Sequence, residues 1–186
     1  MARQLIVVSG LPASGKTTFA RRLSADLDVP LLAKDDIKEL LFEKIPQKDR
    51  EWSTVQGRAA IAMMYAGARE LLCADSTVII ESSFDSRYAL SDIEELRQLV
   101  DAQLIEVHCS LEYAERQRRW SARSATTRHP GHLDDPAHVL SRSQHSDDVP
   151  LYPDIAHIID TGVENSMYEH EYKEILLGVS KRLKDE

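Results

Sequence analysis

A glycine-containing segment close to the start of the chain has the residue types and spacing that bind phosphate groups. Residues 10–17 consist of a glycine, four further residues and then Gly-Lys-Thr, which is the phosphate-loop pattern. Glycines let the backbone curl until successive N–H groups point at phosphate oxygens. We expect Lys16 to bridge the β- and γ-phosphates of ATP and the Thr17 hydroxyl to bind Mg²⁺. The predicted nucleotide-binding residues are Gly10, Leu11, Pro12, Ala13, Ser14, Gly15, Lys16, Thr17 and Thr18.

The sequence on either side of this loop separates it from a chance match in a glycine turn. The apolar run at 5–8 has the composition of a strand buried on both faces of a parallel sheet, and a helical pattern begins near Lys16. A phosphate-binding loop needs this context, because the helix N-terminus adds its dipole and its unpaired N–H groups. The context therefore supports nucleotide binding.

A pair of aspartates follows the second apolar run of the chain. A phosphoryl-transfer enzyme needs a carboxylate to orient the acceptor hydroxyl and take its proton, and Asp35 or Asp36 could supply it. The alternative is helix capping, because an aspartate ahead of a helical segment is a routine N-cap. One division of roles makes Asp36 the cap and leaves Asp35 for chemistry, but the spacing fits both interpretations equally well. Lys38, three residues beyond Asp35, could face the same crevice.

The arginines of the chain are concentrated in one region. Arg119 and Arg123 are four residues apart on a predicted helix and therefore share a face. Arginines placed there could stabilise the charge that develops on a phosphoryl group during its transfer. Arg116 and Arg118 have a simpler interpretation, as solvated side chains or as partners of the glutamates beside them.

Residues 128–132 have the unusual sequence Arg-His-Pro-Gly-His. Proline and glycine predict a turn that could present His129 and His132 to an acceptor or a phosphate. Arg128 would add a third positive group to the catalytic arginines when the segment closes. A His-x-x-His zinc site is a weaker alternative, because no cysteine lies nearby to complete it. A surface turn without a chemical role fits this sequence about as well.

The elements that must position these residues follow from the apolar pattern. Short apolar runs that alternate with helical segments predict an α/β fold, a three-layer sandwich with a five-stranded parallel sheet. The whole chain, 1–186, is expected to be one domain, with an irregular lid at about 124–153. The expected strands are 5–8, 29–32, 77–80, 104–107 and 156–159. The expected helices are 16–27, 37–45, 51–73, one that starts near 86 or at the capping-box spacing of 91–94, 111–124, a short one near 136–144, and 167–183.

Three polar clusters fall where predicted strands end. In open parallel sheets the ligand crevice lies at the carboxyl ends of the strands. The loop that starts at Gly10, the segment 34–36 and the segment 81–83 all occupy such ends. Ser83 and Asp85 are therefore expected to help line the acceptor pocket.

The phosphate loop, together with the basic-Asp-Asp-x-basic sequence at 34–38, resembles P-loop kinases of the group often labelled ATPase-like, here termed AAA_33-type. The chain is similar in these motifs to the kinase domain of phage polynucleotide kinase, to chloramphenicol phosphotransferase and to the zeta toxins. The resemblance implies that Asp35 is the general base and that Lys38 contacts the acceptor. The related kinases prefer arginine at this second position, and lysine lacks the bidentate fork of arginine.

The same resemblance implies roles for residues later in the chain. Glu81, at the end of the third predicted strand, would hold Mg²⁺ through water, although a structural carboxylate is the alternative. Arg119 and Arg123 would lie on the helix after the fourth strand and contact the transferred phosphoryl group. By analogy, the loop 160–162 would pass beside the adenine ring.

Composition and charge exclude several classes of protein. With 42% hydrophobic and 29% charged residues, the chain has ordinary globular composition. A net charge of -8 disfavours broad adhesion to nucleic acid or to anionic membranes. No apolar run approaches the roughly 20 residues that span a bilayer. Cys73 and Cys109 are far apart in sequence and are expected to be reduced thiols, so a cytoplasmic location is predicted.

Together the motifs predict an ATP-dependent kinase that transfers the γ-phosphoryl group to a hydroxyl of a small-molecule acceptor. A 5′-hydroxyl polynucleotide kinase is the first alternative, supported by the aspartate pair and opposed by the acidic charge and the few aromatic residues. A regulatory NTPase without an acceptor is the second. The concentration of arginines and the acidic residue after the second strand favour transfer. The sequence leaves the oligomeric state open.

Overall fold

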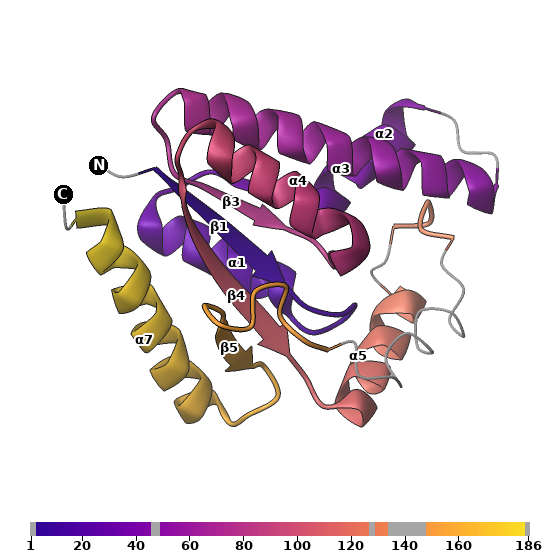
Figure 1. The fold of residues 1–186 in the computed structure, drawn as a ribbon. Coiled ribbons are helices and arrows are strands. Elements are labelled where there is room, and N and C mark those ends of the chain that lie inside the picture. The colour runs from indigo at the N-terminus through magenta and orange to yellow at the C-terminus, as the bar shows by residue number, and fades with distance from the viewer. Residues whose placement is uncertain (1–2, 46–48, 127–128, 134–147, 185–186) are drawn as a thin grey trace.

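The computed structural model describes residues 3–45, 49–126, 129–133 and 148–184, and these residues form a parallel β-sheet between two layers of helices (Figure 1). The sheet has five strands in the order β2-β3-β1-β4-β5, and every neighbouring pair is parallel. The strands are β1 (Gln4–Ser9), β2 (Leu31–Ala33), β3 (Val78–Glu81), β4 (Gln103–Ser110) and β5 (His157–Asp160). The predicted fold class is therefore confirmed.

Helices cover both faces of the sheet (Figure 1). One core cluster joins α1 and α7 to one face, and a second joins α3 and α4 to the other. The described helices are α1 (Lys16–Leu27), α2 (Lys34–Lys44), α3 (Arg50–Cys73), α4 (Ser86–Leu99), α5 (Tyr113–Thr126) and α7 (Asn165–Lys184). None of them is long and apolar enough to cross a bilayer.

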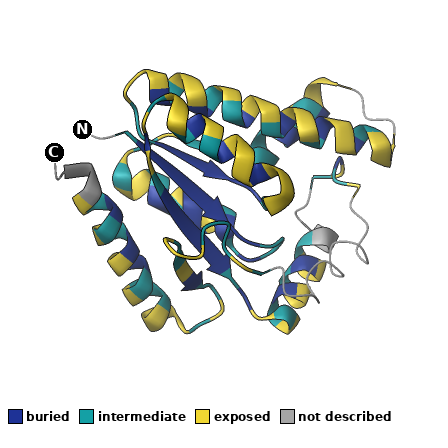
Figure 2. Ribbon diagram, viewed as in Figure 1, coloured by how far each residue is buried: buried dark blue, intermediate teal, exposed yellow. Residues whose placement is uncertain are grey.

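The central strands are buried on both faces, as Figure 2 shows by their dark blue colour. Successive side chains of β1 point to opposite faces, so Ile6 and Val8 pack beneath α1 and α7, whereas Leu5 and Val7 pack beneath α3 and α4. An uninterrupted apolar run, rather than an alternating one, is the sequence consequence of covering both faces.

The parallel register brings the carboxyl ends of the strands to one edge. Val8 lies opposite Glu81, and Ala33 lies opposite Glu81 on the other side of β3. Ser9 lies opposite His108 on β4. The phosphate loop, the start of α2 and the end of β3 consequently meet at this edge, as the sequence predicts.

One predicted helix start differs from the structure, and a second agrees with the earlier of its two predicted positions. The helix α2 begins at Lys34, directly after β2, and its N-cap is Ala33, so the expectation that Asp36 caps this helix was wrong. Asp36 lies in the first turn, where a negative charge favours the helix dipole. The helix α4 begins at Ser86, and the Asp85 carboxylate caps it by accepting a hydrogen bond from the Arg87 N–H at 3.1 Å.

The capping box at 91–94 is therefore interior sequence of α4. No glycine or proline interrupts 86–91, so the helix continues through both possible starts. The expected helix at 136–144 and most of the expected lid at 124–153 lie outside the described residues.

The sheet core makes a matched test of burial possible with one residue type. Ile79 on β3 is fully buried, whereas Ile158 on the edge strand β5 is 59% exposed. We expect Ile79→Ala to lower the free energy of unfolding by about 2–5 kcal/mol, because it leaves a cavity between close-packed layers. Ile158→Ala should change it by less than about 0.5 kcal/mol. Urea denaturation followed by circular dichroism measures both, and equal losses would contradict this assignment of the core.

Candidate active site

The phosphate loop has a backbone that only small or strained residues can form. Gly10 has φ of 141° and Gly15 has φ of 83°, both in the region that favours glycine, and Ala13 adopts a left-handed φ of 67°. A Cβ on Gly10 would overlap the carbonyl oxygen of Cys109 and lie 2.7 Å from the Ser14 hydroxyl. The loop is thus pressed against the end of β4, and glycine at position 10 is a steric requirement.

Lys16 and Thr17 converge on one buried carboxylate. The ammonium of Lys16 lies 3.7 Å from Glu81, and the hydroxyl of Thr17 donates a hydrogen bond to the other oxygen of Glu81 at 3.2 Å. Burial raises the pKa of Glu81 above its ordinary value, and the positive charge of Lys16 opposes this rise. A divalent cation beside this carboxylate would further favour its ionised form.

These groups also fit the predicted Mg²⁺. The hydroxyl of Thr17 has a second lone pair for a metal, and carboxylate and hydroxyl oxygens are the ligands that Mg²⁺ prefers. Thr17 and Glu81 are adjacent in space although 64 residues separate them in sequence. The residues present therefore suit the ion, with Glu81 in position for a direct or a water-mediated contact.

A cavity of about 220 Å³ opens over the phosphate loop. No side chain caps the first turn of α1, so its first N–H groups remain available to an anion at this end of the helix. Seven residues line the cavity: Ala13, Gly15, Lys16, Thr17, Thr18, Arg119 and Arg123.

A larger cavity of about 820 Å³ adjoins the loop on its other side. Its floor is the start of α2, with Lys34, Asp35 and Lys38, and its walls are the facing sides of α3 and α4. The size lies within the range of small-molecule sites, about 300–1,000 Å³. The lining from α3 and from the segment 82–92 is Ser53, Thr54, Gly57, Arg58, Ile61, Tyr65, Ser82, Ser83, Phe84, Asp85, Tyr88, Ala89 and Asp92.

Asp35 lies on the floor of this larger cavity and accepts a hydrogen bond from the ammonium of Lys34 at 2.7 Å. Burial acts to raise the pKa of Asp35, but the charge and hydrogen bond of Lys34, together with the charges of Lys16 and His132, outweigh it and hold the pKa well below its usual range. Asp36 instead pairs with Arg21 on the exposed side of α2 at 2.8 Å. The structure therefore separates the two aspartates that spacing could not distinguish.

Lys38 is a nearly buried member of the cavity floor, and its side chain is 3.6 Å from the position of a Cβ on Gly57. Lys38 thus lies against α3, where a Cβ at position 57 would make only ordinary van der Waals contact with it. Ser83 and Asp85 also line the cavity, although the Asp85 carboxylate is already engaged by capping α4 and by an ion pair with Arg87 at 2.6 Å.

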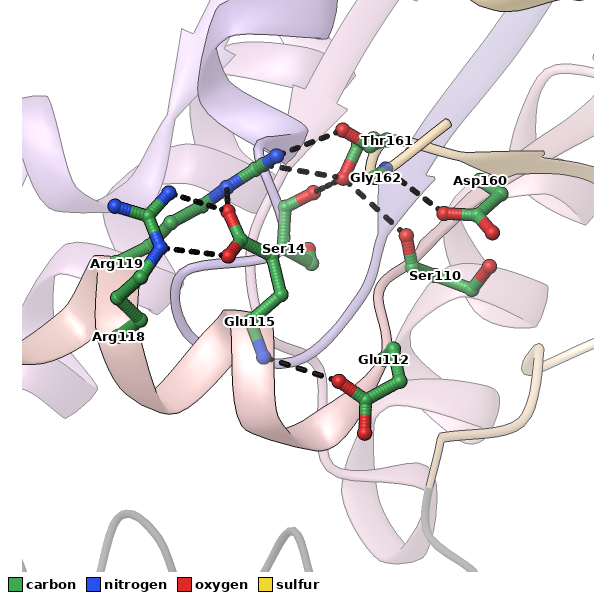
Figure 3. Close-up of polar contacts among 9 residues, drawn as sticks. All are labelled: Ser14, Ser110, Glu112, Glu115, Arg118, Arg119, Asp160, Thr161 and Gly162. Atoms are coloured by element: carbon green, nitrogen blue, oxygen red, sulfur yellow. Dashed lines mark hydrogen bonds and ion pairs between the residues drawn. The ribbon is translucent and has the colours of Figure 1, made fainter. Parts of the chain in front are cut away.

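Figure 3 shows how α5 is joined to the phosphate loop. The guanidinium of Arg119 donates hydrogen bonds to the carbonyl oxygen of Thr161 at 2.9 Å and to Glu115 at 2.8 Å. The hydroxyl of Thr161 in turn donates to the carbonyl oxygen of Ser14 at 2.7 Å. Arg118 pairs with Glu115 at 2.7 Å, in agreement with the sequence analysis.

The other two arginines of α5 behave differently. Arg123 lines both cavities, and its Nε atom is buried without a hydrogen-bond partner among the described residues. Arg116 is only 3% exposed and contacts Asp148 at 3.5 Å, so the expectation of a solvated side chain was wrong for Arg116. Arg128 lies outside the described residues.

The two histidines of the 129–133 turn pack on one aromatic ring. His129 stacks on Phe42 with 5.4 Å between ring centroids, and His132 meets the same ring edge-on at 5.2 Å. A Cβ on Gly131 would overlap this ring, so glycine permits the close approach. His132 also contacts Glu39 at 3.1 Å and borders the large cavity. Across the described ranges, no group of three or more potential ligands is arranged for a metal such as zinc.

The sequence analysis did not identify several residues of the site. Lys34 was considered only as part of a motif, yet its charge and hydrogen bond help to lower the pKa of Asp35. The cavity walls on α3 and α4 were also missed. Their lining residues recur at helical spacing, for example at 54, 58, 61 and 65, but a helix pattern does not reveal which polar face meets a ligand. The contact of the Thr161 hydroxyl with the phosphate loop was not predicted, and the expectation that the loop 160–162 passes beside adenine stays a prediction.

Comparison with protein families gives one match, the family AAA_33, described as an AAA domain, over residues 5–146. No curated protein matches the chain. Among solved structures, a protein of Chloroflexus aurantiacus J-10-fl, provisionally described as a kinase, is 30% identical, with coverage of 97% of this chain and 98% of that chain and a TM-score of 0.86.

Two more distant structures share the fold. A sugar kinase of Janibacter sp. HTCC2649 is 18% identical, with coverage of 96% and 95% of the two chains and a TM-score of 0.61. The APS kinase CysC of Mycobacterium tuberculosis, in complex with AMPPNP and APS, is 16% identical, with coverage of 95% and 98% and a TM-score of 0.60.

The close approach of the loop to β4 leads to a test with two glycines. We expect Gly10→Ala to destabilise the protein by about 1–3 kcal/mol, because alanine is strained at this φ and its methyl group overlaps Cys109. Gly178→Ala, in α7 with no atom within 4 Å of the new methyl group, should stabilise it by about 0.5–1 kcal/mol. Thermal denaturation distinguishes the two, and a neutral Gly10→Ala would refute the steric requirement.

Proposed function

The chain belongs to the AAA_33 family of P-loop kinase domains, and on that premise we propose that it is an ATP-dependent kinase acting on the hydroxyl group of a small molecule. ATP would bind with its phosphates in the loop 10–17. The acceptor would bind in the 820 Å³ cavity. The γ-phosphoryl group would pass from the first site to the second.

The observation that carries this proposal is that the two cavities share cationic side chains. Lys16 and Arg123 line both the 220 Å³ cavity over the phosphate loop and the 820 Å³ cavity floored by α2. A phosphoryl group in transfer carries its charge on the equatorial oxygens, so catalysis consists mainly of positioning and of opposing that charge. Two cations at the junction of a donor and an acceptor site are suited to this task.

The reaction itself breaks and forms one P–O bond. The oxygen of the acceptor hydroxyl forms a bond to the γ-phosphorus, the bond from that phosphorus to the bridging oxygen breaks, and ADP leaves with the electron pair. Asp35 accepts the hydrogen bond of the acceptor hydroxyl, orients it and takes its proton as the new bond forms. Because the pKa of Asp35 is low, its main contribution is orientation, with proton transfer late in a loose transition state.

Thr17 and Glu81 would hold Mg²⁺, which would neutralise charge on the β- and γ-phosphates when bound. The ammonium of Lys16, which lies 3.7 Å from Glu81, would contact oxygens of the same two phosphates. Arg123 would contact the transferred group. Arg119, which already donates to Thr161 and Glu115, would act mainly by holding α5 beside the loop.

The shape of the acceptor cavity supports a small molecule rather than a nucleic acid. Aromatic and aliphatic side chains of α3 and α4, including Ile61, Tyr65 and Tyr88, form its outer walls. Lys38 and Asp35 at its floor provide the polar contacts that orient a hydroxyl compound. The net charge of -8 opposes the general attraction of a polyanion.

The proposal is tested by measuring ADP release with ATP and Mg²⁺ in the presence of pooled sugars, polyols, nucleosides and hydroxy acids. Release that depends on one pool supports the proposed kinase. Release that depends only on a 5′-hydroxyl oligonucleotide would replace it with a polynucleotide kinase. Steady release with no acceptor dependence would replace it with an NTPase.

The two neighbouring aspartates provide a matched pair of variants. We expect Asp35→Asn to lower acceptor-dependent turnover by roughly a hundredfold or more, because the amide can neither take the proton nor bear the charge that orients the hydroxyl. Its affinity for AMPPNP, measured by calorimetry, should change by less than about threefold. Asp36→Asn removes an exposed ion pair with Arg21 and should retain turnover. Similar losses in both variants would contradict the assignment of Asp35.

The pairing of Asp35 with Lys34 predicts a pH dependence. A carboxylate with a lowered pKa stays ionised from neutral into acid solution, so turnover that needs it is present above that pKa and is lost only as the pH falls through it. Lys34→Met removes the charge that lowers the pKa, so the acid limb of the pH–rate profile should move to higher pH. A limb that is unmoved in Lys34→Met would show that Lys34 does not control Asp35.

A further inference from the structure

A chain of buried polar groups lies behind the phosphate loop, on the side of the sheet that faces α3 and α4. Ser9 ends β1 and directly precedes Gly10, and its hydroxyl lies 2.5 Å from Glu106 and 2.8 Å from the Nδ1 atom of His108. The Nε2 atom of His108 lies 3.1 Å from Asp148. Ser9, Glu106 and His108 are each no more than 3% exposed. We name these four residues with Arg116 the buried relay.

The hydrogen bonds of the relay require one proton more than neutral histidine provides. Three contacts in series, from Glu106 to Ser9, from Ser9 to His108 and from His108 to Asp148, need three protons. The serine hydroxyl supplies one and a neutral imidazole supplies one, while ionised carboxylates only accept. The third proton is therefore carried either by His108 or by a carboxylate.

The surroundings of the two carboxylates assign this proton to His108. Glu106 also accepts hydrogen bonds from the backbone N–H groups of Leu151 at 2.9 Å and Tyr152 at 2.7 Å, which favours the ionised form. Asp148 is paired with the permanently charged Arg116 at 3.5 Å. Both carboxylates are thus held as anions.

The charges of the relay then balance. Imidazolium at His108 and guanidinium at Arg116 offset the two carboxylates, Glu106 and Asp148, and buried charges are tolerated when paired and hydrogen-bonded in this way. On β5 the register neighbour of His108 is the uncharged Ile158. Tyr152, beside Glu106, is uncharged as well, because burial first and then Glu94 and Glu106 raise the pKa of its hydroxyl.

The relay connects three parts of the site. Through Ser9 it reaches the residue before the phosphate loop, through Glu106 and Asp148 it holds the segment 148–152, and through Arg116 it holds α5. Arg116, Arg119 and Arg123 are spaced i, i+3 and i+7, so they lie along one side of α5. Fixing Arg116 therefore fixes the rotation of α5 about its axis and the direction in which Arg123 points.

We propose that His108, as a buried imidazolium between Glu106 and Asp148, is a positioning residue that aligns the phosphate loop with the arginines of α5. Without that proton, one of the three contacts would join two acceptors and the relay would carry an unbalanced negative charge. Asp148 would then lose the donor that fixes its position beside Arg116, and the arginines of α5 would be less well aligned with the γ-phosphate. The kinetic consequence rests on the proposed function, but the charge state of His108 does not.

The charge state is tested first, without any acceptor. Histidine labelled with ¹⁵N gives distinct ring signals for imidazolium and neutral imidazole, and His108→Gln identifies the signal of His108. We expect His108 to be an imidazolium at neutral pH in the full chain with AMPPNP and Mg²⁺. In Asp148→Asn we expect it to become a neutral imidazole. The side chain of Asp148 is 28% exposed, so this position should tolerate the change. A neutral ring in the unmodified protein at neutral pH overturns the proposal, whether or not the protein is a kinase.

The positioning role is tested by the pH dependence of AMPPNP affinity. The amide of glutamine at 108 offers an N–H donor group and a carbonyl acceptor but does not titrate. We therefore expect His108→Gln to weaken AMPPNP binding roughly tenfold at neutral pH. It should also abolish the loss of affinity that we expect of the unmodified protein as the pH rises. The matched control is His170→Gln on the exposed side of α7, which should keep the pH dependence of the unmodified protein. If AMPPNP affinity depends on pH in His108→Gln as it does in the unmodified protein, and circular dichroism shows the fold intact, the positioning role is overturned. If His108→Gln does not fold, Asp148→Asn serves for the same test.

Discussion

The contact between Lys16 and Glu81 is the interaction on which the arrangement of the site depends. Lys16 is 7% exposed and Glu81 is 2% exposed, so neither charge could be held there without the other. The pair joins the phosphate loop to the end of β3, and Thr17 strengthens the joint by donating to the same carboxylate. Because β3 also borders β2, the position of this carboxylate sets the distance from the loop to Asp35 at the start of α2.

The parallel sheet explains why the two cavities can share a wall. All five strands of the sheet end at one edge. The order β2-β3-β1-β4-β5 places the phosphate loop, which follows β1, between Glu81 at the end of β3 and the helix α5, which follows β4. The helices α3 and α4 cover the face beneath Leu5 and Val7 and leave the large cavity between their facing sides. The reaction that we propose would therefore need no separate domain to bring its two substrates together.

Sequence reasoning predicted the strands, the phosphate loop and the proximity of Asp35, Lys38 and Glu81, because each rests on a local pattern followed by the rule that parallel strands end together. It could not choose between Asp35 and Asp36, since that choice depends on Lys34 on one side of α2 and Arg21 on the other. Arg116 was misinterpreted for a related reason. Its partner, Asp148, is 32 residues away, and no helical spacing indicates a contact at that separation.

Arg119 and Arg123 on α5 have different contacts and are therefore suited to different roles. Arg119 is held by Glu115 and by the carbonyl oxygen of Thr161, whose hydroxyl contacts the phosphate loop, so a movement of this guanidinium would disturb the joint between α5 and the loop. Arg123 lies one turn further along the helix, borders both cavities and has a buried Nε atom with no partner in the described part of the chain. A buried donor without a partner is costly, and a phosphate oxygen would satisfy it. The fixed arginine is therefore suited to hold the helix in place, and the second to follow the phosphoryl group from donor to acceptor.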